Sequence, residues 1–291
     1  MGNPLLSIIL PVYDRVDHLR VCLDCLAAQT LPHQEWEVIL WSDGGPSCIA
    51  ELARWAETRI PLRFFQGPNQ GPAKARNQAM PHATGAHFLF LNDDIRFAPD
   101  YLHHVQAFVL AHPEYAMIGN TRMASEIIKH DIQHWQAHQD DTFYHITDPL
   151  QGTWEFWHTL NATLPRRWFD EGHRFDEAFP DPAFEDTEFI YRLQRNHGIP
   201  LGFCARAIVE HVHPYTFEGL MRKQRMRGKS AARFVALYPE KYQRIYAVPN
   251  DGGKSLRRRI QEAEKLTNPT TVTEMELALH AEFLRGVLEA Q

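Results

Sequence analysis

The sequence predicts an α/β protein with a mainly parallel sheet flanked by helices and a helical C-terminal extension. Through about residue 120, short apolar runs typical of buried strands alternate with segments whose apolar residues recur at helical spacing. This alternation favours right-handed βαβ crossovers, which build parallel sheets. After residue 249, the stretch "PNDGGKS" has the composition of a linker, and two amphipathic helical patterns follow it.

The first half contains five predicted strands separated by helical patterns. The strands are expected at residues 6–12, 37–41, 62–65, 86–91 and 115–119, and the helices at 16–28, 49–57, 73–83 and 101–112. Ligands of such sheets bind beyond the carboxyl ends of the strands. Three strands end in polar or turn-forming residues, which makes these positions candidates for a site: 11–14, 42–45 and 92–94.

The second half has a less regular pattern. Residues 124–150 are polar and rich in histidine, which suggests a long excursion or a lid. Regular patterns then resume, with a predicted helix at 186–198 and a predicted strand at 201–212. The chain therefore divides into an α/β half, a second half of the same domain and a helical extension: residues 1–120, 121–248 and 249–291.

Composition narrows the class of protein. With 44% hydrophobic and 23% charged residues in a chain of 291, the sequence is typical of a soluble globular protein. The 30 basic residues are outnumbered by 36 acidic ones, so no positive field suggests a nucleic-acid partner. The N-terminal run "LLSIILPVY" is too short to span a bilayer and lacks the basic flank of a signal peptide.

The four cysteines form neither a zinc site nor a disulfide framework. Cys22 and Cys25 make a CxxC pair, but no second pair completes a metal site. Leu19, Cys22 and Leu26 recur at helical spacing, so Cys22 belongs to a buried stripe. Without a leader or disulfides, the sequence favours a reducing cytoplasm.

Two adjacent carboxylates follow the fourth predicted strand. Residues 88–91 are apolar throughout, as in a strand buried on both faces, and Asp93 and Asp94 follow directly after Asn92. A second pair, Asp140-Asp141, has no such context. Asp93 and Asp94 are therefore the candidate ligand-binding residues, because they lie at the end of the sheet where ligands bind.

Four segments together resemble the family 2 glycosyltransferases, whose GT-A fold is a Rossmann-like α/β sheet. They are "SIILPVYDRVDHLRVCLDCLAAQ", "WEVILWSDGG", "NQGPAKARNQAMPHATGAHFLFLNDD" and "RFDEAFPDPAFEDTEFIYRLQRNHG". The resemblance extends over roughly residues 5–235, in the family's order and spacing. It implies an inverting transfer of a sugar from a nucleoside diphosphate sugar to a carbohydrate or glycoconjugate acceptor.

The resemblance implies a divalent cation, Mn²⁺ or Mg²⁺, at the paired carboxylates. The family's D-x-D-like motif becomes Asn92-Asp93-Asp94 here, so Asp94 is the expected metal ligand, with Asp93 near the metal or the ribose. A cation between the phosphates stabilises the departing diphosphate, and carboxylate oxygens suit both metals. His211 and His213 share one face of a predicted strand. Relatives supply a metal-ligating histidine in this region; a packed or solvated pair is the competing interpretation.

The same resemblance assigns donor-binding residues. Asp43, in the counterpart of the family's D-D-G-S motif, is expected to contact the nucleobase or ribose, and Pro11 and Tyr13 lie at the donor-binding end of the first strand. Lys74 and Arg76 fall in the family's N-x-G-x-x-x-A-R-N segment, where Arg76 could pair with a phosphate. An ordinary surface helix would also carry both cations.

Asp186 is the expected catalytic base. An acceptor hydroxyl is a poor nucleophile until a base takes its proton, and the resemblance gives this role to the Asp of the family's E-D motif. Asp186 also begins a predicted helix, so capping is the alternative interpretation. On the acceptor side, the resemblance suggests Asn161, Trp157 and Glu185, although core packing explains the tryptophan at least as well.

Residues 221–234, "MRKQRMRGKSAARF", form a basic cluster. This run could bind a phosphate or anionic lipid at the inner face of the membrane, or form a solvated helix face. Gln224 and Arg227 resemble the Q-x-x-R-W motif of processive relatives, but Gly228 replaces the tryptophan and no transmembrane pattern follows. We therefore expect a non-processive, cytoplasmic enzyme, whose C-terminal helices either pack on the catalytic domain or mediate self-association.

Two other functions compete with this one. A sugar nucleotidyltransferase is expected to carry a Gly-rich phosphate loop after the first strand, and "PVYDRVDHL" has none. A non-catalytic nucleotide-sugar-binding protein of the same fold needs no base. The effect of replacing Asp186 separates such a protein from an enzyme.

Overall fold

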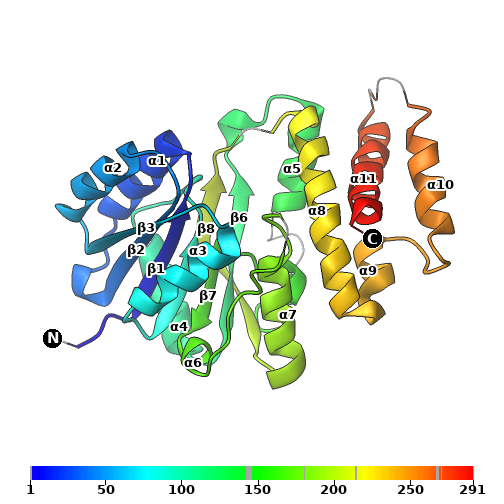
Figure 1. The fold of residues 1–291 in the computed structure, drawn as a ribbon. Coiled ribbons are helices and arrows are strands. Elements are labelled where there is room, and N and C mark those ends of the chain that lie inside the picture. The colour runs from blue at the N-terminus through cyan, green and yellow to red at the C-terminus, as the bar shows by residue number, and fades with distance from the viewer. Residues whose placement is uncertain are drawn as a thin grey trace.

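The computed structural model describes residues 2–141, 146–179, 181–213, 215–266, 269 and 271–290. Within these residues, an eight-stranded sheet forms the centre of the molecule, with strand order β3-β2-β1-β4-β7-β6-β8-β5 (Figure 1). The strands are β1 (Leu6–Val12), β2 (Trp36–Asp43), β3 (Leu62–Gly67), β4 (His87–Leu91), β5 (Ile95–Arg96), β6 (Ala116–Met123), β7 (Asn161–Pro165) and β8 (Leu201–His211).

The N-terminal half is a parallel sheet, as predicted. β1 pairs in parallel with β2 and β4, so that Ile9 lies opposite Ile39 and Phe90. The connecting helices are α1 (Val16–Ala27), α2 (Cys48–Glu57), α3 (Pro72–Ala79) and α4 (Tyr101–Ala111), with short 3-10 helices η1 (His33–Glu35) and η2 (Met80–His82). Ile8 packs in the apolar cluster with α1, α2 and α4, whereas Ile9 packs on the α3 side. Burial on both faces explains why these strands are apolar without alternation.

The second half makes the sheet mixed. β7 lies between β4 and β6 and runs antiparallel to both, and β5 runs antiparallel to β8, whereas β6 and β8 are parallel. β7 follows a long excursion instead of a crossover helix, so its connection imposes no parallel direction. The predicted α/β class is confirmed, and the antiparallel strands are an addition to it.

The polar segment at 124–150 is packed in its described part. It contains η3 (Ser125–Ile127) and α5 (Asp131–Asp140). Ile132 of α5 lies in an apolar cluster with Leu220 and Leu279. Residues 142–145 of the predicted lid lie outside the described residues. The described part is therefore anchored to the C-terminal helices.

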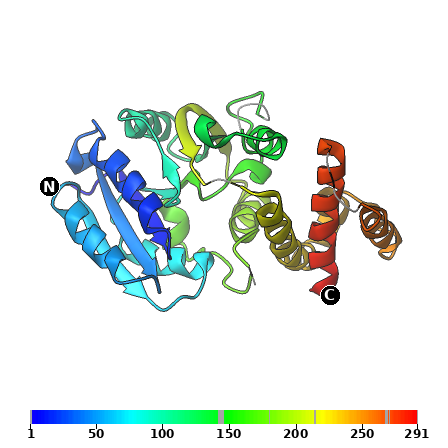
Figure 2. The same ribbon diagram turned by 90° about the horizontal axis from the view of Figure 1, so that it is seen from above.

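The C-terminal extension packs on the helix that precedes it. The later helices are η5 (Trp154–Phe156), α6 (Arg167–Asp170), α7 (Glu185–His197), α8 (Phe217–Leu237), η6 (Pro239–Lys241), α9 (Tyr242–Tyr246), α10 (Lys254–Ala263) and α11 (Val272–Glu289). Figures 1 and 2 show α8, α11 and α10 side by side, at the end of the molecule remote from α2. One apolar cluster includes both Ile9 in β1 and Val287 in α11.

Two glycines allow α8 and α11 to approach closely. A Cβ at Gly228 would lie 1.9 Å from the Phe283 carbonyl oxygen, and one at Gly286 would lie 2.0 Å from that of Arg225. Of the two alternatives for the extension, packing on the catalytic domain thus accounts for the apolar face of α11. None of the described helices combines the length and hydropathy needed to cross a bilayer.

Candidate active site

The paired carboxylates meet a histidine at the carboxyl edge of the sheet. Asp93 and Asp94 follow β4 and are each only 2% exposed. The short strand β5 then pairs with β8, placing Ile95 opposite His211. As a result, His211 Nε2 lies 3.0 Å from Asp94 Oδ2, although the two residues are 117 positions apart. The structure therefore brings together two of the three predicted metal ligands.

The electrostatic environment separates the two carboxylates. The Arg15 guanidinium contacts both: its Nη2 lies 2.9 Å from Asp93 Oδ1, and its Nη1 contacts Asp94 Oδ2. Burial, only partly offset by Arg15, raises the pKa of Asp93 to about 7. Burial also acts to raise the pKa of Asp94, but His211 and Arg15 outweigh it and hold that pKa well below its usual range. Asp94 is thus an ionised carboxylate at neutral pH.

The residues around Asp94 could supply part of the coordination of a divalent cation, with the rest coming from a bound diphosphate or water. Asp94 Oδ1 is buried without a hydrogen-bond partner, which leaves one carboxylate oxygen for a metal. His211 Nδ1 lies 3.4 Å from the Tyr215 hydroxyl, which orients the ring, as is usual for metal-binding histidines. Within the described ranges, no three His, Cys, Asp or Glu side chains are grouped to hold a metal by themselves. A cation here would need oxygens from a bound diphosphate or water.

His213 lies beside this pair without joining it. Its ring centroid is 6.3 Å from that of His211 and 5.9 Å from that of His18. Burial lowers the pKa of His213, which favours a neutral imidazole. Its Nδ1 is buried without a partner. A metal-binding role for His213 stays a prediction.

A left-handed residue begins the helix that carries the second acidic motif. Phe184 has φ +66°, a conformation that costs a non-glycine residue about 1–2 kcal/mol. Glu185 and Asp186 follow as the first residues of α7. The positive end of the helix dipole favours ionised carboxylates at this point. Backbone strain next to acidic side chains, here the buried Glu185 and the partly buried Asp186, is typical of functional sites.

Asp186 is held by groups that stabilise its ionised form. Its Oδ2 accepts a hydrogen bond from the Thr159 backbone N–H at 3.2 Å and lies 3.7 Å from His158 Nδ1. Its Oδ1 accepts the Thr187 N–H at 2.7 Å. Burial acts to raise the pKa of Asp186, but the interaction with His158 and the charge of Arg76 hold it well below its usual range. Burial and the neighbouring Asp186 charge instead raise the pKa of Glu185.

Arg76 ties the two acidic motifs together. Its Nη2 donates to Asn92 Oδ1 at 3.1 Å, next to Asp93, and its Nη1 donates to Glu185 Oε1 at 3.2 Å, next to Asp186. Arg76 is 3% exposed. Its known contacts are thus inside the protein, and the predicted phosphate contact stays a prediction.

The predicted donor residues surround a tight turn after β2. Asp43 accepts hydrogen bonds from the backbone N–H groups of Gln70 and Gly71, both at 2.9 Å, and so fixes the start of α3. Gly45 has no room for a side chain, because a Cβ would lie 1.8 Å from the Tyr13 carbonyl oxygen. Tyr13 itself is 48% exposed, whereas Pro11 lies within β1 and is half-buried. These contacts give Asp43 a structural role beside the predicted one.

Lys74 and Glu185 both lie near Glu177, at the start of α3. Lys74 Nζ lies 3.7 Å from Glu177 Oε2, and both side chains are partly exposed. Glu185 lines a small cavity of about 20 Å³ together with Gln70, Gly71 and Glu177. Lys74 thus remains accessible for a donor contact, and Glu185 reaches toward the same region.

Two predicted acceptor residues belong to the core, which corrects those assignments. Trp157 is fully buried against Phe90, and its indole N–H donates to the Thr163 carbonyl at 3.1 Å. Asn161 is 3% exposed, accepts from the Tyr101 hydroxyl, and donates to the backbone carbonyls of Asn120 and Ala207. Such residues cannot contact an acceptor outside the sheet.

The basic run on α8 is largely paired with acidic side chains. Arg225 contacts Glu282 and Glu289 on α11, and Lys229 lies 3.4 Å from Glu289. Arg233 lies 2.6 Å from Asp176. These ion pairs account for the charge pattern without a phosphate or a lipid, and favour the interpretation as a helix face.

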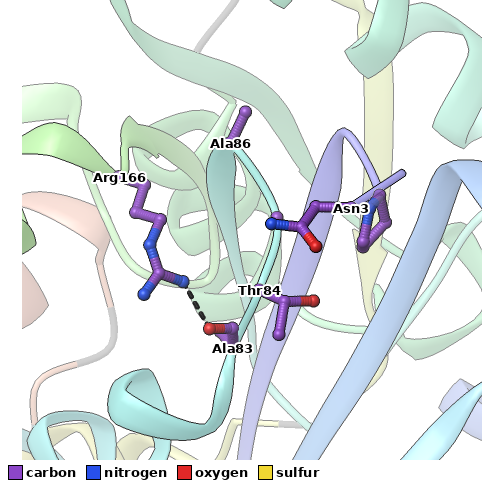
Figure 3. A pocket seen from close by; sticks show the side chains of 7 residues that line it. Asn3, Ala83, Thr84, Ala86 and Arg166 are labelled. Atoms are coloured by element: carbon purple, nitrogen blue, oxygen red, sulfur yellow. Dashed lines mark hydrogen bonds between the residues drawn. The ribbon is translucent and has the colours of Figure 1, made fainter. Parts of the chain in front are cut away.

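A cavity of about 380 Å³ lies at the opposite edge of the sheet (Figure 3). It is lined by residues that precede β1 and β4, among them Asn3 and Thr84, and by Arg166, which follows β7. Figure 3 shows the Arg166 guanidinium bonded to the Ala83 carbonyl. Because parallel sheets bind ligands at their carboxyl ends, we do not assign this cavity to the site.

Three residues of the site were not predicted from the sequence. Arg15 directly follows the first strand end, so the rule that selected residues 11–14 could have found it with one more position. His158 and Tyr215 carry no such signal, because each lies in an irregular segment. His158 meets Asp186 on a different element, whereas Tyr215 contacts His211, four positions earlier.

Comparison with known proteins identifies the family of the chain. The model of the family described as Glycosyl transferase family 2 matches residues 7–173. A validoxylamine A glucosyltransferase of Streptomyces hygroscopicus subsp. jinggangensis is 27% identical over 277 residues, covering 86% of this chain and 65% of the relative. Its counterpart from subsp. limoneus is also 27% identical, with 60% of its length covered. The chain thus spans less than two thirds of the length of these relatives.

Solved structures show the same fold. The mannosyltransferase PcManGT from Pyrobaculum calidifontis, solved with GDP-Man and Mn²⁺, has a TM-score of 0.60 at 16% identity, over 100% of this chain and 74% of that one. S. aureus TarS has a TM-score of 0.56 at 16% identity, and the match covers 89% of this chain and 47% of TarS. The expected GT-A-type fold is confirmed. Since the family model covers more than half of the sequence, the chain belongs to glycosyl transferase family 2.

Proposed function

We propose that this protein transfers a sugar from a nucleoside diphosphate sugar to an acceptor hydroxyl, with inversion, in a non-processive reaction that needs Mn²⁺ or Mg²⁺. The observation that carries the proposal is the position of Arg76. Its hydrogen bonds to Asn92 and Glu185 hold the expected metal-binding motif, residues 92–94, next to the motif of the expected base, residues 185–186. A donor and an acceptor bound at this edge would lie between the two.

On the donor side, Asp94 and His211 would hold the cation. When bound, it would supply Lewis-acid stabilisation of the departing diphosphate. Tyr215 would keep the His211 ring in place, and Lys74 and Tyr13 are exposed enough to contact the donor.

On the acceptor side, Asp186 would act as the base. As the acceptor oxygen forms a bond to the anomeric carbon, the bond from that carbon to the diphosphate breaks, and the hydroxyl proton passes to Asp186. The low pKa of Asp186 keeps it ionised before the reaction, and Thr159 and His158 fix the orientation of its carboxylate. Glu185, beside it, would orient the acceptor.

The donor base is left to experiment. One structural neighbour was solved with GDP-Man and another with UDP-GlcNAc, so both nucleotides are reasonable probes. Thermal unfolding should be measured with UDP, GDP and dTDP and their sugars, with Mn²⁺ and then with chelator. We expect a metal-dependent rise in Tm with one nucleotide, which Asp94→Asn abolishes. No shift with any nucleotide would contradict the proposal.

Replacing the base separates an enzyme from a non-catalytic binding protein. Asp186→Asn should retain the nucleotide-induced rise in Tm and lose release of nucleoside diphosphate from the donor. Retained turnover would refute the role of Asp186. If wild-type protein binds the donor but never releases diphosphate with any sugar acceptor tried, the chain is a binding protein.

The packing around Gly228 supports the proposal of non-processive action. The close packing of α11 on this residue leaves no space for the tryptophan of the processive motif. We expect products that carry a single added sugar, measured by mass spectrometry. A ladder of products would contradict this expectation.

A further inference from the structure

Arg15 covers the carboxylate pair from the solvent side. It lies just before α1, and its guanidinium contacts Asp93 and Asp94 at once. The Arg15 side chain is 39% exposed, whereas both carboxylate side chains are 3% exposed. The arginine therefore stands between the buried acidic pair and the solvent.

The same carboxylate oxygen faces both Arg15 and the predicted metal ligand. Asp94 Oδ2 contacts Arg15 Nη1 and lies 3.0 Å from His211 Nε2. A cation held jointly by Asp94 and His211 would have to lie close to this pair. A guanidinium and a divalent cation at one buried carboxylate oxygen repel each other, because the two positive charges would lie only a few ångströms apart. Arg15 and the cation therefore compete for Asp94.

A donor would give Arg15 another partner. A guanidinium binds phosphate oxygens with the same fork of two donors that it now uses on the two carboxylates. Because the side chain is partly exposed and begins at a loop, it can turn away without opening the core. The negatively charged diphosphate would then replace Asp94 as the ion-pair partner of Arg15.

We propose that Arg15 couples metal binding to donor binding: in the empty site it neutralises Asp93 and Asp94, and on donor binding it releases Asp94 to the cation and pairs with the diphosphate. The inference rests on the proposed function and adds a residue to it. It predicts that the free protein binds the cation weakly and that nucleotide strengthens this binding.

The test is titration of Mn²⁺ into the full chain, with free Mn²⁺ measured by electron paramagnetic resonance. Mn²⁺ is added alone, and then with UDP or with GDP. In wild type, the nucleotide should tighten Mn²⁺ binding at least tenfold. In Arg15→Gln, Mn²⁺ alone should bind at least tenfold more tightly than in wild type, and the gain from nucleotide should shrink. Arg20→Gln is the matched control, since Arg20 lies on α1 and pairs with exposed Asp24 at 3.2 Å.

The outcomes separate this inference from the proposed function. Unchanged Mn²⁺ affinity in Arg15→Gln, with Mn²⁺ binding lost in Asp94→Asn, would refute the role of Arg15 and leave the metal site intact. Unchanged Mn²⁺ and nucleotide binding in Asp94→Asn would refute the metal site itself. If Arg15→Gln does not fold, Arg15→Lys carries the test: it should keep weak Mn²⁺ binding but lose nucleotide affinity at least threefold, and unchanged nucleotide affinity would overturn the inference.

Discussion

Replacing Arg76 tests the link between the two acidic motifs. The Arg76 and Glu185 side chains are 4% and 7% exposed and 3.2 Å apart. Arg76→Met would leave Glu185 as a buried carboxyl without its charged partner, a change that costs about 3–5 kcal/mol. For a chain of this size, such a loss should lower Tm by roughly 10 °C. Thermal and urea unfolding of the purified protein measure it.

A second variant and a control make this prediction specific. Arg76→Met combined with Glu185→Gln removes both buried charges, so the double variant should be more stable than the sum of the single effects by at least about 1 kcal/mol. Arg192→Met, on the same helix as Glu185, should cost less, because Glu188 keeps a hydrogen bond from Tyr238 at 2.8 Å. Equal losses for Arg76→Met and Arg192→Met, or additive effects in the double variant, would refute the reasoning.

Three further variants test other contacts in the structure. Folded Asp93 keeps its proton up to about pH 7, whereas the unfolded group releases it near 3.8, so metal-free protein should lose stability as pH rises through this window. In Asp93→Asn, the free energy of unfolding measured in urea should depend less on pH over this range. An unchanged pH dependence would contradict the prediction. Tyr215→Phe removes the hydroxyl beside His211 and should weaken Mn²⁺ binding about tenfold in the nucleotide complex; unaltered affinity would argue against this contact. Gly228→Ala forces a methyl group against the Phe283 carbonyl and should cost about 1–3 kcal/mol, seen as a lower Tm; an equal Tm would show that α11 is not held there.

Local patterns were sufficient for the N-terminal half of the fold. The strands and helices up to residue 120 were placed within a few residues, because each buries an apolar run or stripe that is visible in a short window. The two-residue strand β5 was missed because it is too short for any periodicity. β7 was missed because its sequence, NATLP, alternates small, polar and apolar residues and ends in proline.

The positions of the candidate site residues could be predicted where these residues end a strand or begin a helix. Asp93, Asp94 and Asp186 lie at such ends, and the sheet edge at which ligands bind is a property of the fold class. Trp157 and Asn161 were misassigned because a motif match gives no measure of burial. Asn161 spans three strands of the sheet with its hydrogen bonds, which a one-dimensional pattern does not reveal.

The sequence by itself determined the α/β class, the order of the N-terminal elements, and the positions of the acidic motifs, because these depend on periodicity within a few turns of chain. Only the tertiary structure decided that His211 meets Asp94, that Arg15 covers the carboxylate pair, and that Arg76 joins Asn92 to Glu185. Each of those contacts joins residues that are 16 to 117 positions apart. Such pairs are fixed by strand register and by the packing of buried charges, which no short stretch of sequence contains.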